Sequence, residues 1–367
     1  MKGKLNLVNV IKFAGAYVAL IIGSGFATGQ EIMQFFTSNG FWSIGSVIIS
    51  LIIFTYFGST IMGSGYDHKG VEKHSAYKYF CGKHLGRFYE IFIPILLFAT
   101  VVIMISGAGA TLKEYYGLNY YIGCALMTIL ILVAYIFGLN NLINVVGLIG
   151  PVIILFSMAV GLIILFQNID GLKNVTDIMQ GVEIQKAGGG WIRSGIIYAT
   201  YNLLIAVLFF TTLGQSADNR KEAVYGGIVG SIAIMLVILI MNLALLSKVD
   251  SIQNLSIPTL YFAESISPIL GKFFSVILLC GIFSTAAPDF WTVCTTISKE
   301  DGKNSKLVAV LVAVFAFLGG LLPFEMLVGK IYPYAGYLGV VLIICILGKQ
   351  VNIKQVNKEK EANKTII

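Results

Sequence analysis

Residues 23 to 31 read Gly23-Ser24-Gly25-Phe26-Ala27-Thr28-Gly29-Gln30-Glu31, and they interrupt a hydrophobic segment that is long enough to cross a bilayer. Three glycines in seven residues weaken a helix at this point. Lipid would also leave the polar side chains of the run unpaired, which costs several kcal/mol. Backbone that is not helical is tolerated at membrane depth only where it faces protein or a water-filled cavity. The run therefore predicts a broken membrane helix beside a polar site, an arrangement typical of secondary transporters.

The composition assigns the chain to the membrane class. Of its 367 residues, 57% are hydrophobic and 12% are charged, and the mean hydropathy is +0.86, which is far from the values of soluble domains. The five cysteines have no CxxC spacing, so we expect neither disulfides nor a zinc site. The sequence contains no Walker, Rossmann, HExxH or GxSxG motif. We therefore predict that the chain is not an enzyme and binds no organic cofactor.

Ten hydrophobic segments approach the roughly 20 residues that a membrane helix needs. Because five is odd, the first and second sets of five run in opposite directions, as in an inverted-topology repeat. The loops Asp67–Leu85 and Lys248–Ser267 follow the second segment of each set and could each hold a short amphipathic helix. We predict an all-α polytopic membrane protein with ten transmembrane helices in a five-plus-five repeat. The segments lie near 8–37, 41–65, 86–111, 119–138, 142–167, 192–214, 222–247, 268–297, 306–323 and 327–348.

The basic residues predict the orientation in the membrane. With the N-terminus inside, 18 of the 25 Lys and Arg residues fall on the cytoplasmic side and seven fall outside. The positive-inside rule favours this orientation, so we expect a plasma-membrane protein with both termini in the cytoplasm. The same bias explains the net charge of +7 without a nucleic-acid partner. The expected parts are a first repeat (1–170), an extracellular loop (171–191), a second repeat (192–348) and a basic tail beside the lipid bilayer (349–367).

The repeat predicts a second break, in the sixth segment. Thr200, Tyr201 and Asn202 form the only polar cluster within that segment, although it has no glycine there. Symmetry with the first segment favours a break at this cluster, which would face the same polar site. The alternative is that the three side chains form hydrogen bonds between helices, worth about 1 kcal/mol.

The ten segments, the Gly-x-Gly of the interrupted first helix and the Gly-x-x-Ser-Thr of the eighth segment resemble the amino acid-polyamine-organocation transporters, which have the LeuT fold. Within that group, Gly25-Phe26-Ala27-Thr28-Gly29-Gln30-Glu31 and Ser284-Thr285-Ala286-Ala287-Pro288-Asp289 are similar to the YkvI family of bacterial membrane proteins. The resemblance extends from about Leu7 to Gly348. It implies a LeuT-like fold with interrupted first and sixth helices and a secondary transporter, of amino acids or related small solutes.

A solute site is expected between the two breaks. Exposed amides near Ser24, Gly25 and Phe26 carry partial positive charge and suit a carboxylate or another anionic group. The alternative is that Gly25 and Gly29 form a small-xxx-small helix-packing motif. Further wall residues are expected from the third and eighth segments, near Ser106, Gly107 and Phe283. The predicted solute-binding set is Gly23, Ser24, Gly25, Phe26, Thr28, Thr200, Tyr201 and Asn202.

A sodium site is expected beside the first break. The break leaves the carbonyls of Ala19 and Ile22 without helical partners. Gly281, Ser284 and Thr285 share one helix face, and the LeuT-fold resemblance matches these five positions to the sodium site of many sodium-coupled members. Oxygen ligands alone suit a hard monovalent cation, and the set includes no carboxylate. The alternative is that the two hydroxyls only bond back to carbonyls one turn earlier.

Two carboxylates lie within apolar segments, Glu31 and Asp289. A carboxylate at membrane depth must either find a partner or carry a proton, so each is a candidate for proton coupling or gating. The alternative for Glu31 is a bond to the loop after the break. For Asp289, beside Pro288, it is a bond to freed backbone groups.

These features predict a secondary active transporter that moves a small polar or zwitterionic solute by alternating access, coupled to sodium or protons. The alternative is a channel, membrane sensor or scaffold that keeps the fold without coupled transport. A channel should line a continuous path with polar rings, whereas the polarity here is confined to the first, sixth and eighth segments. Saturable counterflow would therefore favour the carrier, and unsaturated ion current would favour the channel.

Overall fold

A computed structural model describes residues 5–70, 75–138, 143–299, 302 and 304–364, and within these ranges every regular element is a helix. Eight helices in the described part are long and apolar enough to span a membrane, and α1 and α15 are shorter apolar helices. The helices are α1 (Leu7–Ile21), α2 (Ser24–Thr28), α3 (Gln30–Phe35), α4 (Ser43–Ile53), α5 (Ser59–Asp67), α6 (Ala76–Tyr116), α7 (Tyr120–Phe137), α8 (Ile143–Gln167), α9 (Val175–Ile178), α10 (Trp191–Gln215), α11 (Arg220–Ser247), α12 (Val249–Ile252), α13 (Pro258–Ile266), α14 (Pro268–Ile297), α15 (Ser305–Gly320) and α16 (Phe324–Lys364).

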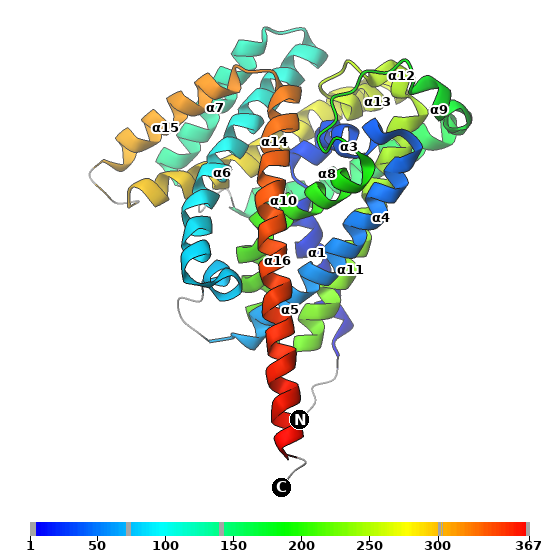
Figure 1. The fold of residues 1–367 in the computed structure, drawn as a ribbon. Helices are drawn as coiled ribbons and strands as arrows, with labels where there is room; N and C mark the ends of the chain where they lie inside the picture. Colours follow the sequence, from blue (N-terminus) through cyan, green and yellow to red (C-terminus); the bar gives the residue numbers. More distant parts are fainter. Residues whose placement is uncertain (1–4, 71–74, 139–142, 300–301, 303, 365–367) are drawn as a thin grey trace.

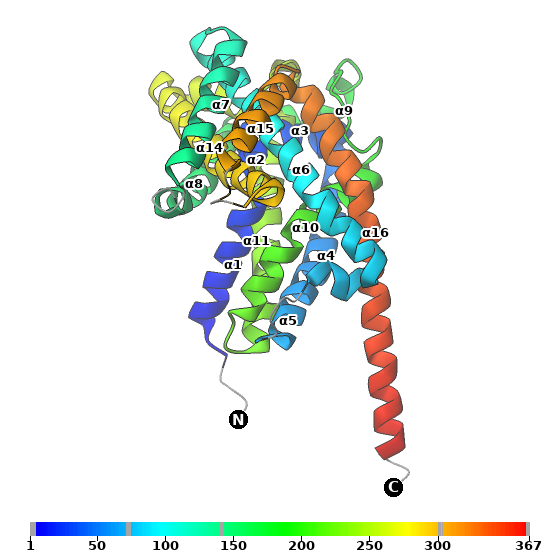
Figure 2. The ribbon, with the colours of Figure 1, turned by 90° about the vertical axis from the view of Figure 1, so that its left-hand side faces the viewer.

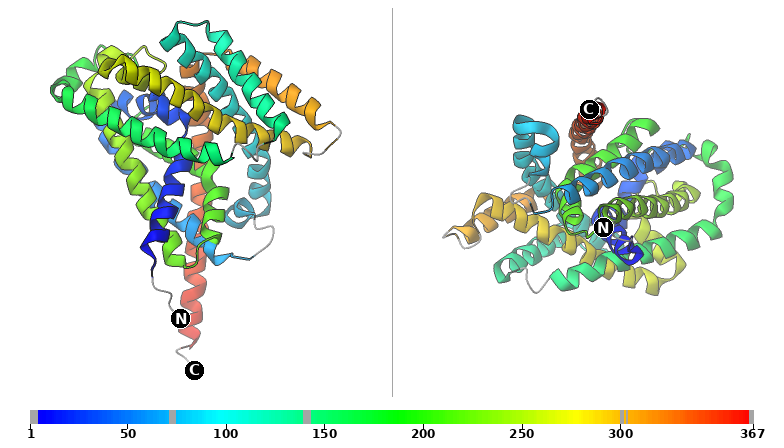
Figure 3. Two further views of the ribbon diagram at one scale, coloured as in Figure 1. Left: turned by 180° about the vertical axis from the view of Figure 1, so that it is seen from behind. Right: turned by 90° about the horizontal axis from the view of Figure 1, so that it is seen from below.

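The packing of the helices follows the predicted repeat. α1 lies along α11, and α10 lies along α4 and α5 (Figures 1 and 2). These pairs are equivalent, because α1 and α10 open the two halves, while α4 with α5 and α11 are the second segments of each. Seen from behind, the yellow α14 crosses the molecule beside α8 (Figure 3), and it also packs against α6. α1 begins and α16 ends on the same side of the molecule (Figure 1).

The predicted break in the first helix is confirmed. α1 ends at Ile21, and the backbone leaves the helical conformation at Ile22 (ψ 85°) and is extended at Gly23 (ψ −176°) before α2 begins. A second interruption follows at Gly29, whose φ of 81° is in the left-handed region that glycine adopts at little cost. A Cβ at Gly29 would lie 2.5 Å from Oγ1 of Thr259 in α13. Glycine is therefore required there both by backbone conformation and by close packing.

The predicted break in the sixth segment is wrong, because α10 is helical throughout Trp191–Gln215. Its polar side chains have partners without unwinding the helix. The Asn202 amide donates to the Tyr198 carbonyl (3.0 Å), and the Thr200 hydroxyl shares its proton between the Ile197 carbonyl (3.1 Å) and the Gly336 carbonyl of α16 (2.7 Å). Side chains that bond back to the previous turn keep the helix closed. Without a glycine to weaken the helix at this point, the polar cluster does not unwind it.

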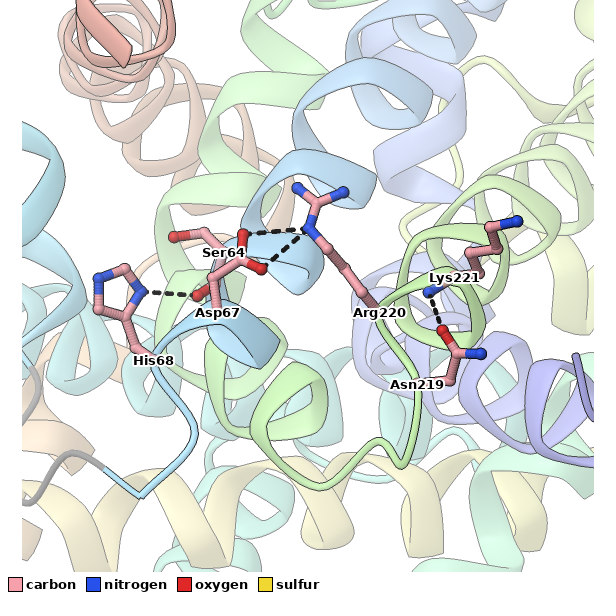
Figure 4. Close-up of polar contacts among 6 residues, drawn as sticks. All are labelled: Ser64, Asp67, His68, Asn219, Arg220 and Lys221. Carbon is pink, nitrogen blue, oxygen red and sulfur yellow. Dashed lines mark hydrogen bonds and ion pairs between the residues drawn. The ribbon is translucent and has the colours of Figure 1, made fainter. Parts of the chain in front are cut away.

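Short helices occupy both loops that were expected to hold them. α12 and α13 lie between α11 and α14. The other loop contributes the first turns of α6, which are set off from the rest of that helix by Gly82 (φ 74°). Near this end of the molecule, Arg220 Nε donates to both carboxylate oxygens of Asp67 (2.9 and 3.1 Å), which ties the end of α5 to the start of α11 (Figure 4).

Candidate functional site

A cavity of about 120 Å³ lies against the break in the first helix. Its polar wall comes from four separate parts of the chain: the broken helix, α10, α14 and α16. Thr100 and Met104 of α6 and several aliphatic side chains complete it. The polar wall consists of Gly23, Gly25, Glu31, Tyr201, Asn202, Thr285, Asp289 and Tyr332.

Two stacked tyrosines form the aromatic part of this wall. The rings of Tyr201 in α10 and Tyr332 in α16 are nearly parallel (5°), with centroids 4.7 Å apart. Both side chains are buried. Tyr332 lines the same cavity as Glu31 and Asp289. Sequence reasoning missed Tyr332, because the tenth segment carries no break or polar cluster that would mark it.

Glu31 occupies the position where a solute carboxylate was expected. A Cβ at Gly25 would lie 2.6 Å from Oε2 of Glu31 and 3.5 Å from the Tyr332 hydroxyl, so the Glu31 carboxylate rests against the main chain of α2. Glu31 is only 5% exposed. Among the described residues, none donates a hydrogen bond to Glu31, and none forms a salt bridge with it. The expected bond from Glu31 to the following loop is therefore not observed.

A second cavity, of about 520 Å³, contains the predicted ion-binding set. Ala19 and Ile22 from the first helix and Gly281, Ser284 and Thr285 from α14 all line it. The amide of Gly23 donates to the Ile21 carbonyl instead of the Ala19 carbonyl, so the break frees a backbone oxygen, as expected. The two cavities share Leu20, Gly23, Thr285 and Asp289 in their walls.

The Ser284 and Thr285 hydroxyls in this second cavity also bond back to their own helix, which was the alternative expected from the sequence. Ser284 Oγ donates to the Gly281 carbonyl (2.8 Å), and Thr285 Oγ1 donates to the same carbonyl (3.3 Å). A hydroxyl that donates its proton in this way still has lone pairs that can accept or coordinate. Pro288 has no amide hydrogen. The Ser284 carbonyl therefore does not receive the helical hydrogen bond that residue 288 would otherwise donate.

Asp289 changes the predicted ion set, which contained no carboxylate. It lines both cavities, on their shared wall. The expected bonds from Asp289 to freed backbone groups are not observed in the described part of the chain. Asp289 lines these cavities because it lies one turn beyond Thr285 on α14, so both side chains project from one helix face toward the break.

Several predicted solute residues lie elsewhere. Phe26 is buried in the core outside the cavity wall. Thr28 donates to the Gly25 carbonyl (2.7 Å), which closes the short α2 helix. Thr200 donates to the Gly336 carbonyl (2.7 Å) and so joins α10 to α16, as its alternative reading had it. The side chain of Ser24 lies outside the described part of the structure.

The expected wall residues of the third and eighth segments are also displaced. Ser106 is bonded to the Leu322 carbonyl (2.9 Å) and to the Tyr120 hydroxyl (2.6 Å), away from the cavity. Gly107 and Phe283 do not line it either. Thr100 and Met104, which precede Ser106 and Gly107 on α6, take their place. The turn of α6 that faces the cavity depends on how α6 packs against the broken helix.

The helix packing and the broken first helix define a class: the chain has the LeuT fold of membrane transporters. It aligns with the manganese transporter of Eremococcus coleocola with a TM-score of 0.56 and 12% identity, covering 95% of this chain and 81% of that one. It also aligns with MhsT in complex with L-phenylalanine (TM-score 0.55, 12% identity, 96% and 99% covered). No protein-family model matches the chain.

Two curated relatives match nearly the whole chain. It is 22% identical to the membrane protein YkvI of Bacillus subtilis (strain 168) over 348 residues, which covers 92% of this chain and 95% of YkvI. It is 23% identical to YyaD of the same organism over 337 residues, covering 89% and 93%. The resemblance to YkvI expected from the sequence is therefore confirmed at full length, and the chain is a membrane protein.

Proposed function

We propose that this protein is a secondary active transporter that moves a small polar or zwitterionic solute by alternating access. The observation that carries the proposal is the pair of adjoining cavities at the break of the first helix, which share Gly23, Thr285 and Asp289 in their walls. A solute and an ion bound there would contact the same three residues. Binding of one could then change the affinity for the other, which is what coupled transport requires.

The contact between α13 and α2, beside the cavities, supports a change of conformation. α13 packs against α2 at Gly29. Two side-chain oxygens at this contact are buried without a hydrogen-bond partner among the described residues, those of Gln30, which follows Gly29, and of Thr259 in α13. Each unsatisfied buried polar group costs about 1–3 kcal/mol. Hydration of these oxygens would offset the loss of packing when α13 moves away from α2, so a closed and an open state could be close in free energy.

Sodium is the coupling ion that the second cavity fits best. The Ala19 and Ile22 carbonyls, the Gly281 carbonyl and the Ser284 and Thr285 hydroxyls supply oxygen ligands from two helices that face each other. Asp289 adds a negative charge on the wall of the same cavity. An ion bridging the first helix and α14 would favour one arrangement of the two, and its binding energy would be coupled to solute affinity.

Solute affinity measured against sodium, with potassium or choline at equal ionic strength, tests this coupling. A ligand that binds the folded state raises its stability by RT ln(1 + [L]/Kd), so thermal shifts of the purified protein report affinity. We expect sodium to increase the shift produced by a solute. Replacing Ser284 and Thr285 together by Ala should remove the sodium effect and leave the protein folded. A solute affinity that ignores sodium in the parent protein would refute sodium coupling.

Proton coupling through Glu31 is the rival. It predicts that Glu31→Gln still exchanges solute across liposomes but no longer accumulates it against a gradient. Full accumulation by this variant would exclude the role. An uncoupled channel or sensor would instead show ion current without saturation, or no solute movement at all. We place the protein in the plasma membrane with both termini in the cytoplasm, because its basic residues lie mainly on that side.

A further inference from the structure

We infer that the solute is a small organic ammonium ion without a carboxylate of its own, and that Glu31 provides its counter-charge. The inference rests on the proposed function, because it assigns the chemical class of the transported solute. Its first support is the position of Glu31 against Gly25. A solute carboxylate seeking the main chain of α2 would meet a carboxylate already there, and two like charges in a buried site repel strongly.

The second support is that the free polar atoms of the wall are mainly acceptors. Asn202 is 8% exposed, and one of its two amide hydrogens is used on the Tyr198 carbonyl, which leaves its side-chain oxygen and one hydrogen for the cavity. Thr285 donates its proton to the Gly281 carbonyl. Thr100 likewise donates its hydroxyl proton to the Leu96 carbonyl (3.1 Å), so both threonines offer lone pairs to the cavity.

These atoms select a ligand rich in donors. Among the described residues that line the cavity there is no Lys, Arg or His, so none of them can balance the charge of a solute carboxylate. The side chains of the wall keep three donors, which are the hydroxyls of Tyr201 and Tyr332 and one amide hydrogen of Asn202. Lone pairs come from a larger set: Glu31, Asp289, Thr100, Thr285 and the Asn202 oxygen. An ammonium group has three donors, no acceptor and a positive charge, which complements such a set. The two tyrosine rings add a further attraction, because aromatic faces attract cations.

The remaining lining favours an organic ion over a metal ion. Leu20, Ile21, Ile205 and Ala206 present hydrocarbon to the cavity, which suits a short alkyl chain. In the described ranges, no three His, Cys, Asp or Glu residues gather as metal ligands. A divalent ion needs six or more oxygen ligands at close range. The volume of 120 Å³ corresponds to about four water molecules at about 30 Å³ each, so the solute should be a short amine.

Three matched compounds test the inference: isobutylamine, valine and isobutanol. Valine is isobutylamine with an added carboxylate, and isobutanol has the same carbon skeleton without the charge. Thermal shift and calorimetric titration of the purified full chain in detergent would measure binding of each. We expect isobutylamine to bind at least about tenfold more tightly than either of the others. Equal or tighter binding of valine would overturn the inference, as would no binding of isobutylamine, ethylamine or 1,4-diaminobutane at millimolar concentration.

Variants at Glu31 test its role directly. Glu31→Gln should weaken isobutylamine binding by about tenfold or more. The same change at Glu183, an exposed carboxylate outside both cavities, should have no effect. Glu31→Ala removes the charge and opens space at Gly25, so the ratio of valine to isobutylamine affinity should rise. That ratio is a readout that a general loss of stability would not change. If Glu31→Gln does not fold, Glu31→Ala is measured in its place, and an unchanged ratio of valine to isobutylamine affinity in the folded variant would overturn the inference.

Separate measurements distinguish failure of the inference from failure of the proposed function. Binding of isobutylamine without uptake into liposomes would refute transport and leave the assigned ligand class intact. Saturable uptake of a zwitterionic solute, with isobutylamine inert as a competitor, would refute the ligand class and leave transport intact. Displacement of bound isobutylamine by Mn²⁺ but not by other amines would also overturn the assignment, because it would identify a metal site.

Discussion

Replacing Gly25 with Ala should reduce solute binding while leaving the fold intact. The added methyl group would lie 2.6 Å from Oε2 of Glu31, so the carboxylate must move. The end of a Glu side chain shifts easily, and alanine gains up to about 1 kcal/mol over glycine in a helix. The free energy of unfolding should therefore change by less than about 1 kcal/mol. The cavity, however, would lose roughly the volume of one water molecule, about 30 Å³, from its 120 Å³.

Loss of a quarter of the cavity together with displacement of Glu31 should weaken solute binding at least about tenfold, or 1.4 kcal/mol. The assay is a titration of solute against the purified variant, with its melting temperature measured in parallel. Gly15→Ala is the matched control, because a Cβ at Gly15 meets no atom within 4 Å and this face of α1 is exposed. Gly25→Leu should abolish uptake altogether. Parental affinity in Gly25→Ala, in protein of normal stability, would show that the solute binds elsewhere.

Three further substitutions test the framework around the site. Gly29→Ala forces an L-residue into a left-handed conformation and against Thr259, and it should cost at least about 1–2 kcal/mol of stability; an unchanged melting temperature would contradict this. Arg220→Gln removes the half-exposed ion pair with Asp67, and it should cost less than about 1 kcal/mol, with the effect vanishing at high salt. Thr200→Val removes the hydrogen bond from α10 to α16 and should cost about 1 kcal/mol; transport lost with stability unchanged would instead indicate a direct role in the site.

The sequence predicted the first break and failed on the second for a physical reason. Around Gly23 and Gly29, glycine weakens the helix, and the polar side chains near them require a protein or water environment. Around Thr200 and Asn202 the residues are also polar, but the Asn202 amide bonds to a carbonyl of the preceding turn, and the Thr200 hydroxyl lies between such a carbonyl and the Gly336 carbonyl of α16. Polarity alone therefore does not indicate unwinding, because Thr and Asn can satisfy themselves within a helix.

The five residues predicted for the ion site line one cavity, whereas the residues predicted for the solute site do not all do so. Ser284 and Thr285 share a helix face with Gly281, so helical periodicity brings them to one cavity. The contact between Glu31 and Gly25 has no such periodicity, because Gly29 turns the chain between them. Spacing along the sequence could not have shown that this carboxylate returns to the main chain six residues earlier.

The sequence by itself determined the membrane environment, the apolar segments, the antiparallel halves and the position of the first break, because these depend on local hydrophobicity and on glycine. Tertiary structure alone decided which side chains share a cavity. Tyr332, Met104 and Asp289 come from three different helices, and their meeting depends on the angles at which α16, α6 and α14 cross the broken helix. Crossing angles are set by the packing of whole helix faces, so no single segment carries the information that brings these residues to one site.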